Sequence, residues 1–455
     1  MYSVISPNNS EEIGSWSDTP AADIDRYFEG LSSARLGSLE SLEWRRDLLV
    51  DFINEIDRDR SNLADIIVEE VAKKPAEAND EIDYAVAFLR EYVACLDTYC
   101  FETTTLAGRS VLEVGHGVAV LICPYNDPIA GLCRKIGPAV AAGCPFILKP
   151  SPLGVLTAKQ LMKLFHTAGG SAVGQIVLTD DPETVGRIIG HDEVGIVSFT
   201  GSTQIGREVA MAAGQAVTKC VLELGGNCPY LVFPEADLDK AVADLVERKL
   251  KAAGQACSAV NRVFVHSTIF KAFRDRLFDR ISGISAGPAR KAGVDLAPVR
   301  TRQSVERLDQ LVTRARNGGE KAHSVKANIR LPKKSFLFPM TVIETGKDSN
   351  SVLDLDEAFG PLLSLRPFTD SNEIINRVAA ERHALVIYAY GATKTTKESI
   401  VAQCAYGSIG FDTTRIQSPS APTGGFGNAG YGREGGVYGM REFLATKNIC
   451  DVVDG

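Results

Sequence analysis

Short apolar runs alternate with amphipathic stretches from Val118 onward, and this alternation constrains the fold more than any other feature of the sequence. Helix-like segments such as 156–167 and 205–213 separate runs rich in valine, isoleucine and leucine. The pattern predicts βαβ units and a parallel sheet that is buried on both faces. The expected strands cover residues 118–122, 146–148, 175–178, 195–199 and 230–233, and a second alternation adds 262–265 and 385–390.

The segment before Val118 is expected to be helical. Leu48, Phe52 and Ile56 recur at intervals of four residues, so they share one face of a helix within residues 42–95. Pro234 opens FPEADLDKAV, the start of another helix, and marks a boundary between two α/β units. The predicted fold class is therefore α/β, with two or three domains in a chain of 455 residues.

Composition limits the classes of function. The chain is 45% hydrophobic and 23% charged, as globular proteins are, and a net charge of −8 without a basic run disfavours nucleic-acid binding. No apolar run approaches the ~20 residues of a membrane span, and the N-terminus lacks signal-peptide features, so we expect a cytoplasmic protein with no membrane partner. The cysteines include no CxxC pair and the histidines show no ligand spacing, so no metal site is expected.

Three residues are candidates for catalysis, and each also has an ordinary structural interpretation. Cys257, in GQAC, is either a buried small residue or a thiolate nucleophile. Glu223, in ELGG, is either a strand-end charge or a carboxylate in a cleft, where the two glycines let a ligand approach the backbone. Asn126 follows the first core strand, where it either forms a turn or donates its amide to an oxyanion.

Other segments suggest a site for a nucleotide. FTGSTQIG, at 199–206, leads from a strand into a helix whose N-terminus can receive a phosphate. Lys149 ends another strand, where it either binds ribose or phosphate oxygens or is solvated. Glu357 and Phe359 are two residues apart and are expected to face the same side of an extended segment. One would bind a sugar hydroxyl and the other would pack on a flat ring.

The order of seven motifs, PYN, KPS, FTGST, ELGG, GQxC, EAFGP and GGF…GRE, resembles the aldehyde dehydrogenase superfamily across nearly the whole chain. The resemblance implies NAD(P)-dependent oxidation of an aldehyde to a carboxylic acid. Cys257 would be the nucleophile, the Asn126 amide and the Cys257 backbone N–H would hold the oxyanion, and Glu223 would activate water. The cofactor-binding residues that it implies are Lys149, Ser151, Pro152, Phe199, Gly201, Ser202, Glu357 and Phe359.

Departures from the family pattern bear on the choice of cofactor. Many NAD-preferring members have a Glu that binds the adenosine ribose where this chain has Pro152. Because nothing at that position repels a 2′-phosphate, we infer a slight preference for NADP over NAD. Gly186, in DDPETVG, matches a family glycine but is shifted by one residue.

The predicted substrate pocket is more polar than is common in the family. Arg134 and Lys251 resemble the paired basic residues of succinate-semialdehyde dehydrogenases, and Ser418 lies where that subfamily offers a hydroxyl. Asp127 and Thr423 replace aromatic residues. Two desolvated cations require an anion, which predicts a small acidic semialdehyde such as succinate semialdehyde. Alternatively, Arg134 pairs with Asp127 and neither touches substrate.

The resemblance also predicts three structural units. A Rossmann-like cofactor-binding domain would comprise residues 1–96 and 116–233, and a catalytic domain residues 234–435. Residues 97–115 and 436–455 would form a β hairpin and tail that assemble a homodimer or homotetramer.

Three other functions remain open. Asp127 leaves room for an aminoaldehyde or another polar aldehyde as substrate. A CoA-acylating dehydrogenase usually lacks the water-activating Glu, so Glu223 argues against that class. A non-catalytic binding protein of the same fold would typically have lost the nucleophile or the cofactor residues, which this chain retains.

Overall fold

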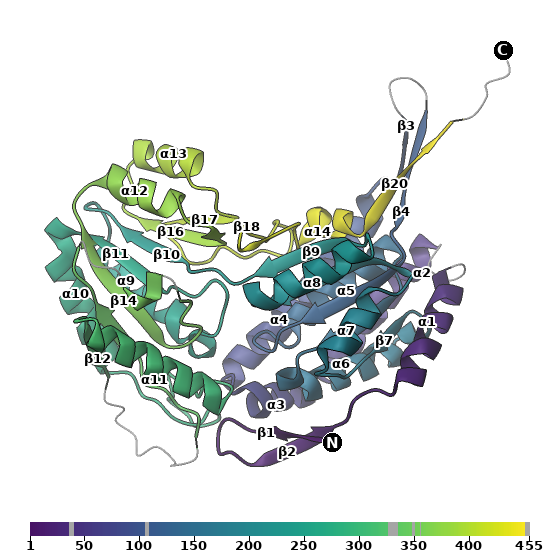
Figure 1. Cartoon of the computed structure of the whole chain (residues 1–455), viewed down its shortest axis with the longest axis horizontal. Coiled ribbons are helices and arrows are strands. Elements are labelled where there is room, and N and C mark those ends of the chain that lie inside the picture. The colour runs from purple at the N-terminus through teal and green to yellow at the C-terminus, as the bar shows by residue number, and fades with distance from the viewer. Residues whose placement is uncertain (36–40, 105–108, 326–334, 348–350, 355, 451–455) are drawn as a thin grey trace.

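Two α/β lobes and a small projecting sheet form the molecule (Figure 1). The computed structural model describes residues 1–35, 41–104, 109–325, 335–347, 351–354 and 356–450. This architecture confirms the predicted α/β class. Among the described residues, no helix has both the length and the apolar character needed to cross a membrane.

The first lobe is built on a six-stranded sheet with the order β19-β9-β8-β5-β6-β7. Every side chain of the central strand β5 is buried, and alternate residues enter different cores: Leu121 packs on one face, and Val120 and Ile122 on the other. The strands are β5 (Val118–Cys123), β6 (Phe146–Pro150), β7 (Gly174–Ile176), β8 (Val194–Gly201), β9 (Lys219–Leu224) and the antiparallel β19 (Gly430–Tyr431).

Helices cover both faces of this sheet. Those that contribute to the larger core are α2 (Leu42–Arg58), α3 (Arg60–Val71), α4 (Pro75–Thr98), α5 (Ala130–Ala142), α6 (Val155–Thr167) and α14 (Gly436–Glu442). Those on the opposite face are α1 (Ala21–Arg35), α7 (Pro182–Ile189) and α8 (Thr203–Gln215). The periodicity of Leu48, Phe52 and Ile56 is confirmed, because all three are buried along α2.

The second lobe is built on a seven-stranded sheet with the order β12-β13-β14-β11-β10-β16-β17. All neighbours pair in parallel except β12 with β13. The strands are β10 (Pro229–Val232), β11 (Arg262–His266), β12 (Lys321–Ser324), β13 (Thr341–Glu344), β14 (Leu362–Phe368), β16 (Val386–Tyr390) and β17 (Ser408–Phe411). Its helices are α9 (Leu238–Leu250), α10 (Ser267–Ser282), α11 (Arg302–Asn317), α12 (Ser371–Ala379) and α13 (Lys394–Gln403).

A third sheet projects from the first lobe (Figure 1). It has the order β20-β4-β3 and comprises β3 (Glu102–Thr104), β4 (Ser110–Gly115) and β20 (Leu444–Ile449). The hairpin and the C-terminal strand therefore lie together, as the sequence predicted, although residues 105–108 and 451–455 lie outside the described part. Two short pairs complete the fold: β1 (Tyr2–Ile5) with β2 (Glu12–Trp16), and β15 (His383–Ala384) with β18 (Phe426–Gly427).

Strand pairing corrects the expected domain boundaries. β10 pairs with β11 and β16, so the chain passes to the second sheet between Leu224 and Pro229, before the predicted boundary at 233/234. The apolar run of β10 fits either sheet, and Pro234 marks only its end. Within 234–435, β19 returns to pair with β9, and α14 packs on α4 and α5 instead of joining the tail.

Candidate active site

The residues predicted from the sequence for catalysis line one cavity of about 410 Å³. Asn126 comes from the loop after β5, Glu223 from the end of β9, and Cys257 from the segment between α9 and β11. In parallel sheets, ligands bind outside the carboxyl ends of the strands. The cavity lies at these ends for β5 and β9, and the second lobe supplies the thiol.

A tight turn presents Cys257. Ala252, Ala253 and Gly254 have φ angles of 48°, 54° and 73°, so three consecutive residues adopt the left-handed region. A Cβ on Gly254 would lie 2.4 Å from the carbonyl oxygen of Gly360, so only glycine fits there. Gln255 holds the turn in place, because its Oε1 accepts from the backbone N–H of Arg300 at 2.9 Å. Backbone strain of this kind concentrates at functional sites.

The Cys257 thiol is half-buried and protonated in this environment. Burial, followed by the negative charges of Glu223 and Asp127, raises its pKa well above the ordinary range, and Arg134 opposes this only in part. The thiol therefore needs a nearby base before it can act as a nucleophile.

Glu223 is 3% exposed, and its Oε1 has no hydrogen-bond partner within the described part of the chain. Burial, followed by the charge of Glu434, raises its pKa to about 8. Glu434 itself stays ionised, because Lys135 lies 2.5 Å from its Oε1 and outweighs the effect of burial. The result is a carboxyl group that exchanges a proton near neutral pH, as general bases do.

Arg134 lies in the same cavity but is incompletely paired. It is 7% exposed, and its closest carboxylate, Glu434, lies 3.6 Å away. Its Nε and Nη2 atoms have no hydrogen-bond partner among the described residues. The guanidinium packs over Phe88, 4.9 Å from the ring centre, and near Tyr84. Buried donors without acceptors are costly, so they point to an anionic ligand.

Asp127 is paired elsewhere. Its Oδ1 lies 2.8 Å from Lys73, whose ammonium is also 2.5 Å from Glu81. Although burial opposes ionisation, Lys73 lowers the pKa of Asp127 to about 2. The alternative in which Arg134 pairs with Asp127 is therefore not the arrangement found.

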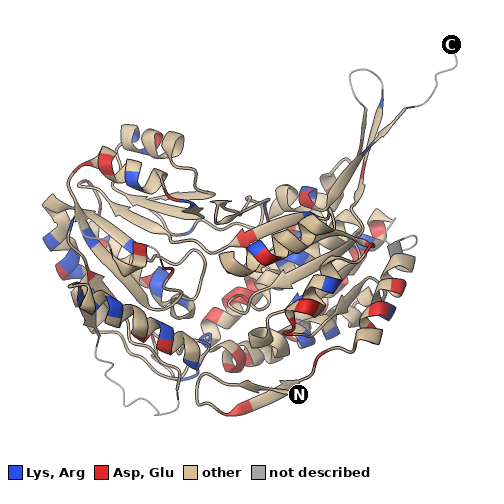
Figure 2. Ribbon diagram, in the orientation of Figure 1, with Lys and Arg blue, Asp and Glu red and all other residues tan. Residues whose placement is uncertain are grey.

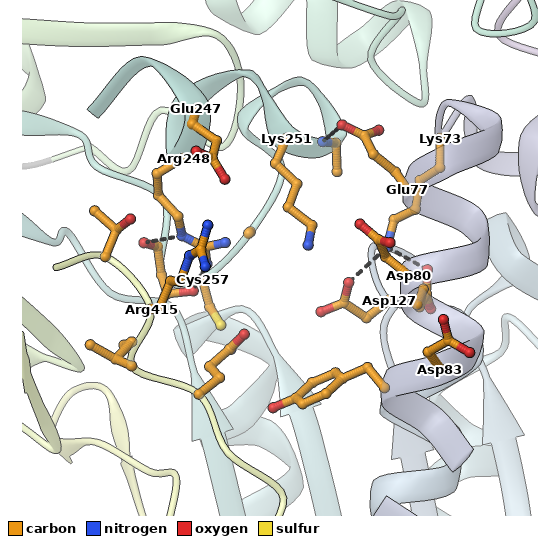
Figure 3. A pocket seen from close by; sticks show the side chains of 18 of the residues that line it. Lys73, Glu77, Asp80, Asp83, Asp127, Glu247, Arg248, Lys251, Cys257 and Arg415 are labelled. Carbon is orange, nitrogen blue, oxygen red and sulfur yellow. Dashed lines mark hydrogen bonds and ion pairs between the residues drawn. The ribbon is translucent and has the colours of Figure 1, made fainter. Parts of the chain in front are cut away.

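A wider outer cavity of about 630 Å³ leads to Cys257, and each of its sides carries charges of both signs, since Glu247 lies beside Arg248 and Lys73 lies on the side of α4 (Figure 3). Arg248, Lys251 and Arg415 lie on the side of Cys257, and Lys251 extends into the space. Facing them is α4, which carries the carboxylates Glu77, Asp80, Glu81 and Asp83. In the ribbon as a whole, charges of both signs are also interspersed along the helices (Figure 2).

A further cavity of about 370 Å³ contains the predicted cofactor residues of the first lobe. Lys149, Ser151, Pro152, Phe199, Gly201 and Ser202 all line it. Ser202 caps α8, so the N-terminus of α8 opens into this space. Gly186 also lines it, and an added Cβ there would meet nothing within 4 Å.

Glu357 and Phe359 line the 410 Å³ cavity beside Cys257. Burial raises the pKa of Glu357 to about 8 although Arg307 and Lys249 favour its ionised form, and its Oε1 has no partner among the described residues. The segment is not simply extended, since Phe359 has a φ of 41°. Its ring meets Tyr125 edge-on at 6.2 Å.

Two predicted pocket residues lie apart from the others. Neither Ser418 nor Thr423 is among the described residues that line these three cavities. The Ser418 hydroxyl is 3.0 Å from that of Ser420, and Thr423 exchanges backbone hydrogen bonds with Glu434. Their role in the pocket stays a prediction.

Several charged residues of the site were missed from the sequence. Lys135 is adjacent to Arg134, and Glu434 lies within the GRE motif, so both positions carry a signal in the sequence. Lys73, Arg248 and Asp180 gave no signal, because only the folded chain brings them to the cavities.

Comparison with known proteins identifies relatives over the whole length. Residues 1–449 match the model of the aldehyde dehydrogenase family. A glutarate-semialdehyde dehydrogenase of Pseudomonas aeruginosa is 32% identical, with 98% of this chain and 93% of that protein covered. An NADP⁺-dependent succinate-semialdehyde dehydrogenase of Escherichia coli is 31% identical, with the same coverage. A betaine aldehyde dehydrogenase from Staphylococcus aureus, solved with NAD⁺, has a TM-score of 0.93 at 25% identity and covers 98% of this chain and 90% of its own.

The raised pKa of Glu223 predicts a pH-dependent stability. The folded state binds this proton more tightly than the unfolded state, so the contribution is fully present below the ordinary pKa of 4.5 and is lost as the pH rises through about 8. Between about pH 5 and about pH 9, the free energy of unfolding should fall by a few kcal/mol more in the wild type than in Glu223→Gln. Urea denaturation at each pH measures this difference, and parallel pH profiles would contradict the prediction.

Proposed function

The chain belongs to the aldehyde dehydrogenase family, and from that premise we propose that it oxidises a carboxylate-bearing aldehyde to a dicarboxylic acid through Cys257. One observation supports this most directly. The nucleophile Cys257, the base Glu223 and the incompletely paired Arg134 line the same cavity. A carboxylate bound by Arg134 would hold the aldehyde end of a short substrate within this cavity.

The first steps follow from the proton balance of the site. Glu223 takes the proton of the Cys257 thiol, and the resulting thiolate attacks the aldehyde carbon to give a thiohemiacetal oxyanion. The Asn126 amide and the Cys257 backbone N–H donate to that oxyanion, and losing one such donor typically costs about 3 kcal/mol. A bound nicotinamide would supply the hydride acceptor for this oxidation, and Cys257 would then hold the acyl group as a thioester.

Hydrolysis then regenerates the enzyme. Glu223 first releases the thiol proton to solvent and then removes a proton from water, so that hydroxide adds to the thioester carbon. The carboxylic acid leaves as Glu223 returns this second proton to the Cys257 sulfur. A pKa of about 8 suits both roles, because Glu223 must accept and release a proton in each cycle. Glu434, held ionised by Lys135, keeps that pKa high through its negative charge.

The residues fit a nicotinamide cofactor. Glu357 presents an unpartnered Oε1 that can accept a hydrogen bond from a ribose hydroxyl. Gly225 leaves room for this carboxylate, because a Cβ at position 225 would lie 2.5 Å from Glu357 Oε2. Lys149 and the N-terminus of α8 can bind the remaining sugar and phosphate oxygens. The slight preference for NADP, which rests on Pro152, stays a prediction.

The acidic substrate is supported by two sets of observations. Arg134 and Lys251 both border the space in front of Cys257, and neither has a close ion pair in the described structure. The names of the succinate- and glutarate-semialdehyde relatives also indicate dicarboxylic semialdehydes. A chain of four or five carbons would place its carboxylate away from the reacting carbon.

An aminoaldehyde is the second candidate, supported by the carboxylates of α4. Asp80 lines the outer cavity and forms no ion pair or hydrogen bond with any described residue. Asp83 lies one turn further along, but Arg60 neutralises it at 2.7 Å. Asp80 thus offers a charge that an ammonium group can neutralise.

Two further expectations remain proposals. The projecting sheet of β3, β4 and β20 supports assembly into a homodimer or homotetramer, because its outer strands leave edges that can pair with a second copy. The cytoplasmic location rests only on the sequence features.

The first prediction concerns the two catalytic groups. Cys257→Ala should abolish aldehyde oxidation but leave cofactor binding intact, because only the nucleophile is lost. Glu223→Gln should slow both acylation and deacylation, because Glu223 accepts the thiol proton in the first half-reaction and a water proton in the second. Stopped-flow absorbance at 340 nm, together with mass spectrometry of the quenched enzyme, tests both. Turnover near the wild-type rate in Cys257→Ala would remove this thiol from the mechanism.

The second prediction concerns substrate charge. Wild-type kcat/KM should favour 4-oxobutanoate over butanal by at least about tenfold, which corresponds to about 1.4 kcal/mol of transition-state binding. Arg134→Gln should remove most of this preference by raising KM for the acid alone. Arg90→Gln, on an exposed part of α4, is the matched control and should keep the preference. An equal effect of Arg134→Gln on both substrates would contradict the proposed anion site.

The third prediction separates the two candidate substrate classes. Asp80→Asn should leave kcat/KM for 4-oxobutanoate unchanged or raised if the substrate is acidic, because a like charge is removed from the path. If the enzyme is an aminoaldehyde dehydrogenase, the same change should lower kcat/KM for 4-aminobutanal several-fold. Asp83→Asn is the control, since Arg60 already neutralises that carboxylate.

A further inference from the structure

The 370 Å³ cavity of the first lobe has two chemically different ends. One end is a slot between α7 and α8, lined by the apolar side chains Val185, Ile189, Ile205, Val209 and Ala212. The other end is polar and lies where β6 and β7 finish, beside Lys149. An apolar slot suits a flat base, so the attached ribose would lie at the polar end.

The polar end contains a carboxylate that lies outside the sequence motifs. Asp180 follows β7 and lines the cavity together with Lys149 and Pro152. Its side chain is exposed and, within the described part of the chain, forms no hydrogen bond or ion pair. Pro152 itself offers no carboxylate, but it lines the same cavity as the carboxylate of Asp180, which follows the neighbouring strand β7.

Lys149 and Asp180 influence each other without direct contact. Desolvation lowers the pKa of Lys149, and the negative charge of Asp180 is the largest opposing influence. The ammonium of Lys149 likewise has no hydrogen bond or ion pair among the described residues. A hydroxyl group between them could donate to the carboxylate and accept from the ammonium. A phosphate could only accept, and would face the carboxylate with a like charge.

The charges that line the cavity also favour a hydroxyl group over a phosphate at this position. Among the described residues that line it, Lys149 is the only cation, whereas Asp180 and Glu208 are both carboxylates. NADP sites usually accommodate the 2′-phosphate with an arginine, and NAD sites bind the 2′-hydroxyl with a carboxylate. Among the described residues, this cavity is lined by carboxylates and by no arginine, which is the composition of an NAD site.

We infer that Asp180 binds an adenosine ribose hydroxyl of the cofactor and makes NAD, not NADP, the preferred dinucleotide. The inference rests on the proposed use of a nicotinamide cofactor and opposes the preference that Pro152 alone suggested. Pro152 shows only that one position lacks a carboxylate. Asp180 and Glu208 place two others in the same cavity.

Equilibrium binding to the full-length protein tests the inference without turnover. Dissociation constants for NADH and NADPH are measured by nucleotide fluorescence in the wild type, Asp180→Asn and Asp180→Gly. The wild type should bind NADH at least about tenfold tighter than NADPH, since a charge-assisted hydrogen bond replaces a like-charge contact. Both variants should reduce that ratio about tenfold or more, by weakening NADH and strengthening NADPH.

Glu183→Gln is the matched control. Glu183 is an exposed carboxylate three residues from Asp180, in the first turn of α7, and it is not among the cavity-lining residues. Its variant should keep the wild-type ratio. Tighter binding of NADPH by the wild type, or a ratio unchanged in both Asp180 variants, would overturn the inference. Failure of aldehyde oxidation with the binding preference intact would instead contradict only the proposed function.

Discussion

The buried ion pair between Lys135 and Glu434 links the two parts of the chain that build the active site. Lys135 is on α5, and Glu434 lies 299 residues further along in the segment that returns to the first sheet. Their side chains are 1% and 6% exposed, and Lys135 also donates to Ser198 at 2.8 Å. Removing one partner of such a pair typically costs about 3–5 kcal/mol, because the other charge is left buried and unpaired. The packing around Lys135 and the ionised state of Glu434 therefore both depend on this ion pair.

That contact also sets the chemistry of its neighbours. With Lys135 present, the buried Glu434 carries a negative charge, and this charge opposes ionisation of Glu223. Glu223 in turn raises the pKa of Cys257. A negative charge on either Glu223 or Cys257 therefore opposes ionisation of the other. The predicted pH dependence of stability arises from the same series of charges.

Much of the fold could be predicted from local patterns, because burial on both faces of β5 and on one face of α2 leaves a clear periodicity in the sequence. Local patterns do not predict which of the two sheets a strand joins. The apolar run of β10 would suit either core, and only its pairing with β11 and β16 decides the question. The motifs singled out Asn126, Glu223 and Cys257 from three separate segments, and all three line the same cavity. They could not show that Lys73 binds Asp127, because that contact joins residues 54 apart.

The same limit explains why a missing residue is weak evidence about specificity. Pro152 was interpreted as the absence of a carboxylate, yet a cavity is lined by several segments, and another segment can supply the missing charge. Asp180 does so from the loop after β7, and Glu208 from α8. Likewise, the alternative in which Arg134 pairs with Asp127 is not found, because Arg134 lies near Glu434 and Asp127 pairs with Lys73. Arg134 keeps unpartnered donors, whereas Asp127 is paired with Lys73. The specificity of each cavity therefore depends on its total charge and on which charges remain unpaired, more than on the residue at any one motif position.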